Sequence, residues 1–245
     1  MNQRALILIP LFLLAFAGSL CKAQVPELRA RWVPFEGDSM RIEYCLPMAE
    51  AVRPAVIVLS DRYGAQENVR STLKVLATIG FRAFALPLQS APEQPFDKTP
   101  SVDIDSTDVA RVTRLAVEII NEKGCDGKVL LLGFDVGANI AIEVIARFPF
   151  YKGAMLFYPT GGAAALHRLL DAKCPLLLRV AQFDPECSLA DVNSLRELFM
   201  DRGQNLHVYY FKDAKRFFFN PQHPDYHKRN TQTAWNQINK FFRLQ

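Results

Sequence analysis

An aspartate stands where the chain turns from an apolar segment into an amphipathic one. Residues 128–134 (KVLLLGF) read as a buried strand, and residues 136–147 read as a helix with one apolar face. The turn between them is Gly133-Phe134-Asp135-Val136-Gly137. Glycines on both sides of three residues let a strand and a helix approach closely, which exposes the middle side chain. Asp135 is therefore the first candidate catalytic residue, and a carboxylate there could act as a nucleophile.

Other charged and aromatic side chains follow apolar segments elsewhere in the chain. The carboxyl ends of parallel strands meet at one edge of a sheet, where ligands bind, so these side chains are expected to converge on Asp135. Asp184 follows the apolar run 176–181, and Arg216 follows the run 206–211. The remaining candidate pocket residues are Asp61, Arg62 and Tyr63, which follow the run 55–59, and Tyr158, which ends the run 153–158.

The elements that must position these residues alternate along the chain. A hairpin is expected over residues 32–44, and short apolar strands then alternate with helices. The expected strands are 55–59, 82–86, 128–134, 153–158, 176–181 and 206–211, and the expected helices are 67–79, 106–123, 136–147, 163–170, 189–202 and 228–243. Such alternation predicts one α/β domain with a mostly parallel sheet and helices on both faces. Ser106 is the expected N-cap of its helix.

With these motifs in order, the chain resembles the dienelactone hydrolase family of α/β-hydrolases over roughly residues 30–243. The resemblance rests on Ser60-Asp61-Arg62-Tyr63-Gly64, the turn around Asp135, Phe183-Asp184-Pro185 and the segment 214–220. It implies an α/β-hydrolase fold with a triad. The family's cysteine falls on Asp135, its acid on Asp184 and its histidine on Arg216. It also implies that the N–H groups of Arg62 and Val136 form an oxyanion hole, which a carboxylate oxygen of Asp135 could occupy.

Two of these three triad positions carry the wrong residue for triad hydrolysis. An esterified aspartate must be released by water, which a histidine normally activates. Arginine keeps its proton at any working pH, so Arg216 cannot replace it. The sequence holds four other candidate imidazoles, which by their positions are more typical of solvated surface residues: His167, His207, His223 and His227. An imidazole within hydrogen-bond reach of Asp135 would favour an active enzyme.

Arg216 is instead expected to lie between Asp135 and Asp184 as a salt bridge, with Asp61 as a third acid nearby. Three acids and one arginine would leave a net negative pocket. We expect Arg216→Ala to destabilise the protein more than Asp135→Asn, because Asp184 would still pair with the arginine. A metal held by Asp61, Asp135 and Asp184 is disfavoured, since Arg216 already supplies positive charge.

Two functions remain open from the sequence. The first is a protein that has lost hydrolysis and keeps the fold as a binding or structural module, with a small-molecule ligand and no cofactor. The second is a working hydrolase of a small ester or lactone that uses a rearranged site. The net charge of +4 over 245 residues is too balanced to indicate a nucleic-acid partner. The sequence contains no evidence on oligomeric state.

The first 23 residues have the pattern of a secretory signal. Arg4 precedes an apolar run over residues 5–17, and small residues lead to Ala23. The expected product is a domain over residues 24–245, secreted or periplasmic and free of the membrane after cleavage. An uncleaved anchor is the alternative, but the run is short for a membrane span. The cysteines of that domain lack a scaffold spacing and are expected as isolated thiols: Cys45, Cys125, Cys174 and Cys187.

Overall fold

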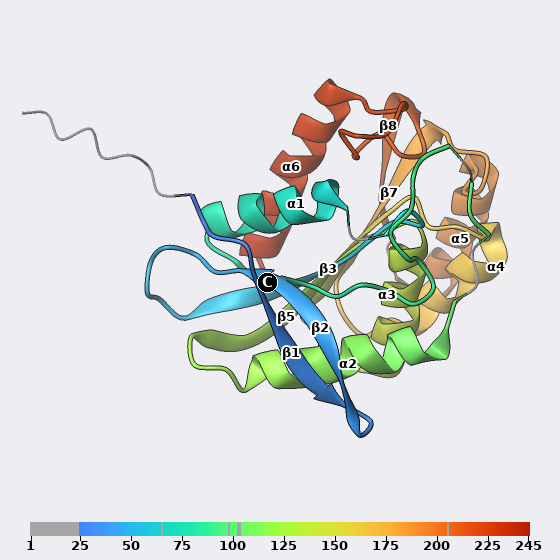
Figure 1. The fold of residues 1–245 in the computed structure, drawn as a ribbon. Helices are drawn as coiled ribbons and strands as arrows, with labels where there is room; N and C mark the ends of the chain where they lie inside the picture. The colour runs from blue at the N-terminus through green and yellow to red at the C-terminus, as the bar shows by residue number, and fades with distance from the viewer. Residues whose placement is uncertain (1–24, 65, 98, 102–103, 205) are drawn as a thin grey trace, which may run out of the picture.

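A twisted sheet of eight strands crosses the part of the chain that the structure describes (Figure 1). This computed structural model describes residues 25–245 apart from 65, 98, 102–103 and 205. The strand order is β1-β2-β4-β3-β5-β6-β7-β8. β2 is antiparallel to β1 and β4, and every other pairing is parallel. The expected mostly parallel α/β sheet is therefore confirmed.

The strands are short and largely buried where they cross the centre of the sheet. Their bounds are β1 Arg29–Phe35, β2 Asp38–Cys45, β3 Arg53–Leu59, β4 Arg82–Ala85, β5 Cys125–Phe134, β6 Gly153–Phe157, β7 Leu176–Phe183 and β8 His207–Lys215. Every residue of β6 is buried, as are the last six residues of β5. Burial on both faces explains why these strands read as continuous apolar runs rather than alternating patterns.

Helices cover both faces of the sheet. Their bounds are α1 Glu67–Thr78, α2 Ser106–Ile120, α3 Val136–Arg147, α4 Gly162–Leu166, α5 Leu189–Asp201 and α6 Lys228–Arg243, with a 3₁₀ helix over His167–Asp171. α1 and α6 pack their apolar side chains on one face, and α2, α3 and α5 pack theirs on the other (Figure 1). Each face thus has its own hydrophobic core, as a doubly covered sheet requires.

Differences from the sequence-based elements are found at their ends and in one helix that is divided in two. β5 begins at Cys125 and β8 continues to Lys215, because sheet pairing extends strands beyond their apolar centres. The expected helix 163–170 is divided between α4 and the 3₁₀ helix. Asp105, rather than Ser106, caps α2, since its side chain accepts the Thr107 N–H at 2.8 Å.

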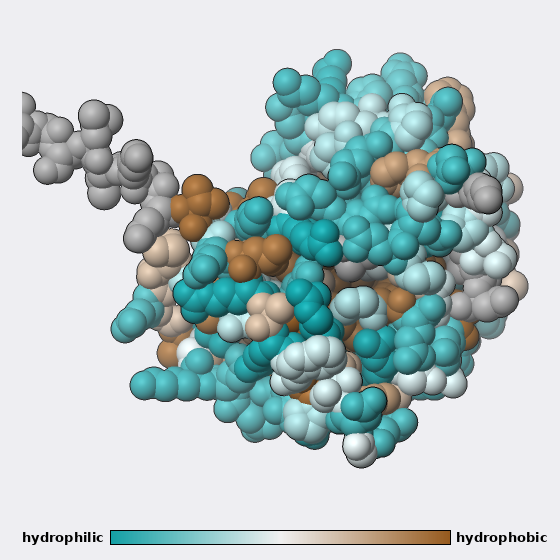
Figure 2. Space-filling model, in the orientation of Figure 1, coloured by the Kyte–Doolittle hydropathy of each residue, from teal (hydrophilic) through white to brown (hydrophobic). Residues whose placement is uncertain are grey.

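The predicted signal segment 1–23 lies outside the described residues. Among the described helices, none combines the length and the hydropathy needed to cross a bilayer. The face of the molecule seen in Figure 2 is mostly hydrophilic, with apolar residues in small groups. The four cysteines named above are all unpaired thiols in the structure.

Candidate functional site

Asp135 lies in a strained turn between β5 and α3. Its backbone has φ 53° and ψ −118°, a conformation that side-chain-bearing residues rarely adopt. A Cβ at Gly137 would lie 2.4 Å from the Ser60 carbonyl oxygen, and a Cβ at Gly133 would lie 2.7 Å from the Ala138 Cα. Both glycines are therefore required by close backbone approach. The turn thus has the geometry that the glycine spacing predicts.

The Asp135 side chain points into a ring of arginine donors and is fully buried. Arg62 Nε lies 2.6 Å from Oδ2, and Arg62 Nη2 lies 2.8 Å from Oδ1. The Arg62 backbone N–H donates to Oδ2 at 3.0 Å, and Arg216 Nη2 donates to Oδ1 at 2.5 Å. Both carboxylate oxygens therefore accept two charge-assisted or backbone hydrogen bonds each.

Arg216 lies between Asp135 and Asp184, the two aspartates that the family resemblance assigns to triad positions. Its Nη1 lies 2.7 Å from Asp184 Oδ1, while its Nη2 contacts Asp135. Asp184 Oδ1 also accepts the backbone N–H groups of Glu186 and Cys187 at 2.9 and 3.2 Å. The planar guanidinium matches two carboxylates at once, as its fork of donors allows. This places Arg216 between Asp135 and Asp184, as the sequence predicts.

Two members of the network were not identified from the sequence. The Arg62 side chain turns into the site, although only its backbone N–H was expected there. Glu186 accepts Arg62 Nη2 at 2.7 Å and lies 3.7 Å from Arg216 Nε. The spacing Asp184-Pro185-Glu186 on one turn is the signal that could have indicated this second acid. The expected count of three acids and one arginine is therefore wrong.

Arg62, Arg216, Asp135, Asp184 and Glu186 form a network of ion pairs, called the arginine network below. Its charges nearly balance. Burial alone would raise the pKa of the Asp135 carboxyl, but the hydrogen bonds of Arg62 and the charge of Arg216 lower it below its usual range. Glu186 behaves likewise, because Arg62 and Thr160 outweigh burial and lower its pKa. Burial raises the pKa of Asp184, and the charge of Arg216 offsets that only in part. In total, the two guanidiniums of the network face three carboxyl groups, those of Asp135, Asp184 and Glu186.

Asp61 lies beside this network with a different protonation behaviour. Burial, followed by the negative charge of Asp135, raises the pKa of Asp61 to about 7. Its Oδ1 accepts the Tyr63 N–H at 3.0 Å, and its Oδ2 accepts Asn220 Nδ2 at 3.3 Å. Asp61 is therefore a carboxyl that changes charge near neutral pH, rather than a permanent fourth anion beside Asp135, Asp184 and Glu186.

Aromatic rings cover the two arginines. The Phe217 ring centre lies 5.7 Å from Arg62 Cζ and 5.8 Å from Arg216 Cζ. Tyr158 lies 5.9 Å from Arg216 Cζ, and Tyr63 packs edge-on against Phe217. Burial and the charge of Asp61 raise the pKa of Tyr158 well above its usual value. Both tyrosines named from the sequence therefore lie beside the network, in which the two arginines are buried.

The two backbone N–H groups that were expected to form an oxyanion hole differ from each other. The Arg62 N–H donates to Asp135 Oδ2, so the aspartate accepts a bond at one expected donor. The Val136 N–H is the other expected donor. In the described chain it donates to neither carboxylate oxygen of Asp135. The carboxylate oxygens accept hydrogen bonds from Arg62 and Arg216 instead.

Among the described residues, the histidines make no hydrogen bond to the Asp135 carboxylate. His223 packs in the aromatic group, with its ring 4.5 Å from that of Phe217, and its Nδ1 accepts the Asp225 N–H at 3.1 Å. Burial lowers the pKa of His223 below its usual value. His227 caps α6 by accepting the Asn230 N–H. In the described chain, the hydrogen bonds that reach the Asp135 carboxylate come from arginines, not from an imidazole.

The metal alternative does not match the geometry. Arg216 contacts both Asp135 and Asp184, so a guanidinium lies where a cation would have to bind. Within the described ranges, no group of three or more potential ligand side chains is arranged to hold a metal ion.

The sequence model of the dienelactone hydrolase family matches residues 43–245. The chain belongs to the dienelactone hydrolase family. Its relatives include a protein named "Putative carboxymethylenebutenolidase" from Salmonella typhi, which is 23% identical over 232 residues and aligns with 86% of this chain and 84% of its own.

Solved structures agree on the fold of this dienelactone hydrolase family member. A dienelactone hydrolase-like structure from Klebsiella pneumoniae superposes with a TM-score of 0.81 at 20% identity, covering 89% of this chain and 99% of that one. The dienelactone hydrolase-like promiscuous phosphotriesterase P91 from metagenomic libraries gives 0.67 at 17% identity, covering 89% and 98%. These likenesses establish the α/β-hydrolase fold, while the chemistry depends on the residues described above.

Proposed function

We propose that this dienelactone hydrolase family member has lost triad hydrolysis and acts as a binding or structural module. The observation that carries the proposal is the state of Asp135. Its carboxylate is fully buried and accepts four hydrogen bonds, three of them from guanidinium groups. A nucleophile needs a free lone pair that faces the substrate, and these bonds hold both oxygens. The strained turn therefore carries a carboxylate that is paired with two arginines, and not a free nucleophile.

The absence of a base at the histidine position supports the same conclusion. Water must lose a proton to release a covalent intermediate, and Arg216 has no lone pair with which to accept it. The charges of Asp135 and Asp184 also raise the pKa of Arg216 despite its burial. Arg216 therefore stays a proton-holding cation, which stabilises carboxylates and does not activate water.

One observation favours the second candidate, an active hydrolase of a small ester or lactone with a rearranged site. The pKa of Asp61 near 7 suits a general acid or base at neutral pH. Asp61 is buried and held by the Tyr63 N–H and Asn220, so it would need to reach a water molecule to act. If Asp61 is the general acid or base of such an enzyme, hydrolase activity should depend on Asp61.

The deciding experiment measures turnover of p-nitrophenyl acetate and of the lactone dihydrocoumarin. The parent, Asp135→Asn and Asp61→Asn proteins are compared with Asp201→Asn, an exposed aspartate at the end of α5. We expect the same background rate from all four proteins. Multiple turnover by the parent that Asp201→Asn keeps and Asp135→Asn loses would refute the proposal. Turnover lost only in Asp61→Asn would support the rearranged hydrolase.

We also propose that the protein is exported, with its mature chain starting near Gln24. The support is the sequence pattern of residues 1–23, in which a basic residue precedes a short apolar run and Ala23. The test is expression in a bacterium with N-terminal sequencing of each cell fraction. Leu13→Arg, which interrupts the apolar run, should keep the chain in the cytoplasm. A parent protein that retains residues 1–23 in the cytoplasm would contradict the proposal.

A further inference from the structure

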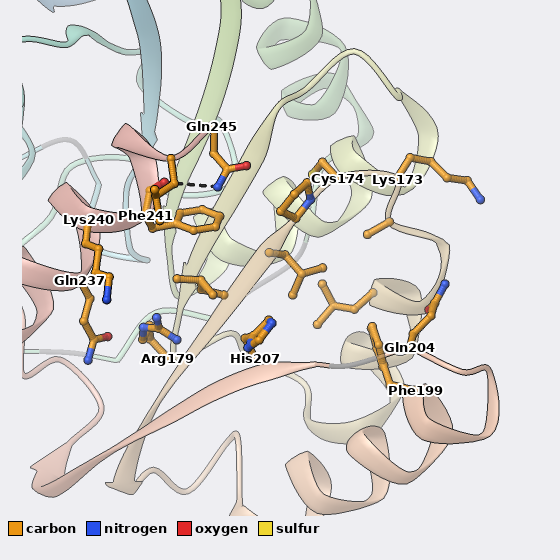
Figure 3. Close-up of a pocket in the computed structure, with 16 residues that line it drawn as sticks. Lys173, Cys174, Arg179, Phe199, Gln204, His207, Gln237, Lys240, Phe241 and Gln245 are labelled. Carbon is orange, nitrogen blue, oxygen red and sulfur yellow. Dashed lines mark hydrogen bonds between the residues drawn. The ribbon is translucent and has the colours of Figure 1, made fainter.

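A hollow of about 910 Å³ opens at the edge of the sheet opposite Asp135. It lies where β7 and β8 begin, and residues of α6 form one wall (Figure 3). Asp135 follows the carboxyl end of β5, whereas Leu176 and His207 stand at the amino ends of their strands. The hollow is therefore separate from the arginine network, and the proposed function does not explain it.

A buried arginine without a carboxylate partner lines this hollow. Arg179 is 94% buried on β7, and its Nη1 donates to the Leu178 carbonyl oxygen at 3.0 Å. Its Nε is buried without a hydrogen-bond partner. Among the described residues, the ion pairs include none with Arg179. A buried guanidinium is normally paired, because burial without a counter-charge is costly.

Further polar side chains line the same hollow as Arg179. Figure 3 shows Arg179, His207 and Gln237 together at one end of the hollow, with Lys240 above them on α6. The Gln237 Oε1 is also buried without a partner. At the rim, the Gln245 main-chain oxygen is already bonded to Lys128 Nζ at 2.8 Å. This end of the hollow therefore has positive charge and unsatisfied polar atoms without an acidic side chain among its lining residues.

The rest of the hollow is largely apolar. Its apolar lining comes from the 3₁₀ helix, β7, the end of α5, and α6 with the residue that follows it, and includes Leu169, Leu176, Leu177, Phe199, Phe241 and Leu244. A pocket with an apolar wall and a few convergent polar groups is the usual form of a small-molecule site. A volume of about 910 Å³ falls in the range of such sites. The combination selects a ligand with one anionic end and an apolar body.

We propose that this hollow binds an amphipathic carboxylate, with the carboxylate on Arg179 and its apolar chain along the leucine and phenylalanine wall. The guanidinium would then gain the bidentate partner that its geometry suits. Burial lowers the pKa of Arg179 to about 10 against the opposing effect of Tyr209, which is consistent with a cation that lacks its counter-charge. The competing role is packing, since the Tyr209 ring lies 6.0 Å from Arg179 Cζ.

The test is calorimetric titration of the full-length mature protein with decanoate, decanol and acetate, kept below micelle formation. We expect decanoate to bind with a stoichiometry of one, and decanol and acetate to bind at least tenfold more weakly. Arg179→Met keeps the length of the side chain and removes the charge. It should fold, because replacing an unpaired buried cation by an apolar side chain is tolerated, and it should bind decanoate at least tenfold more weakly.

Arg53→Met is the matched control, because Arg53 is an exposed arginine at the start of β3 that lines a different hollow. It should bind decanoate as the parent does. Equal decanoate affinity in Arg179→Met and the parent would overturn the proposal, and so would equal affinity of the parent for decanol and decanoate. Absence of decanoate binding by the folded parent would overturn it as well. These outcomes do not depend on hydrolase activity, so they are distinct from failure of the proposed function.

Discussion

The guanidinium of Arg62 and the carboxylate of Asp135 form a two-pronged ion pair between segments 73 residues apart. Nε lies 2.6 Å from Oδ2 and Nη2 lies 2.8 Å from Oδ1, and both side chains are buried. The same Arg62 donates its backbone N–H to Oδ2. One residue thus supplies the backbone donor expected of an oxyanion hole and a side chain that binds the aspartate carboxylate. This relationship ties the turn around Asp135 to the segment that follows β3.

Arg216→Ala should lower the free energy of unfolding by about 3–5 kcal/mol, because Asp135 and Asp184 lose a buried counter-charge. Urea unfolding monitored by tryptophan fluorescence measures the change. Arg168→Ala is the control, since that arginine pairs with Glu143 at a half-exposed site and should cost less than about 1 kcal/mol. Equal stability of Arg216→Ala and the parent would refute the role of Arg216 as a structural ion.

Asp135→Asn should cost about as much as Arg216→Ala, which revises the smaller loss expected from the sequence. The new amide group would oppose donors of two arginines, whereas the sequence indicated only one. The double variant Asp135→Asn, Arg216→Ala should lose less than the sum of the single losses, because the two residues contact each other. Unfolding curves of all three variants and of Asp201→Asn test this. Additive losses would show that the two residues are not coupled.

Asp61 should make stability depend on pH between about 4 and 7. Its pKa in the folded state is about 7, above the ordinary value of 3.8, so the folded protein keeps a proton that the unfolded chain releases in this window. The contribution is complete below about pH 4, falls as the pH rises and is lost above about 7, with a total of a few kcal/mol. Asp61→Asn should flatten the curve of unfolding free energy against pH, while Asp201→Asn should keep it. Identical curves for Asp61→Asn and the parent would show that Asp61 does not titrate there.

Gly137→Ala should be strongly destabilising, because its Cβ would lie within 2.6 Å of backbone atoms of Leu59 and Ser60. Gly203→Ala is the comparison, since Gly203 has φ +67° but open space around its added Cβ. Gly203→Ala therefore carries a backbone conformational cost of about 1–2 kcal/mol without a steric clash. Thermal melts of the two variants measure the difference. A Gly137→Ala protein as stable as Gly203→Ala would show that the strand and helix can separate at the turn.

The sequence determined the frame of this protein. Apolar runs of strand length and amphipathic runs of helix length predicted the alternating elements, because burial on a doubly covered sheet selects those patterns. The glycine spacing around Asp135 predicted the turn, since only glycine permits the close approach at Gly133 and Gly137. Asp184 and Arg216 follow parallel strands, so backbone topology alone was enough to place them beside Asp135.

Only the tertiary structure decided how the side chains share their charges. Arg62 could have faced solvent, but in the fold it reaches Asp135 and Glu186, which are 73 and 124 residues away in the chain. The pKa of Asp61 and the unpaired state of Arg179 likewise depend on burial by distant segments. Periodicity records which face of an element is buried. It does not record the rotamer of a long polar side chain or the partner it meets across the fold.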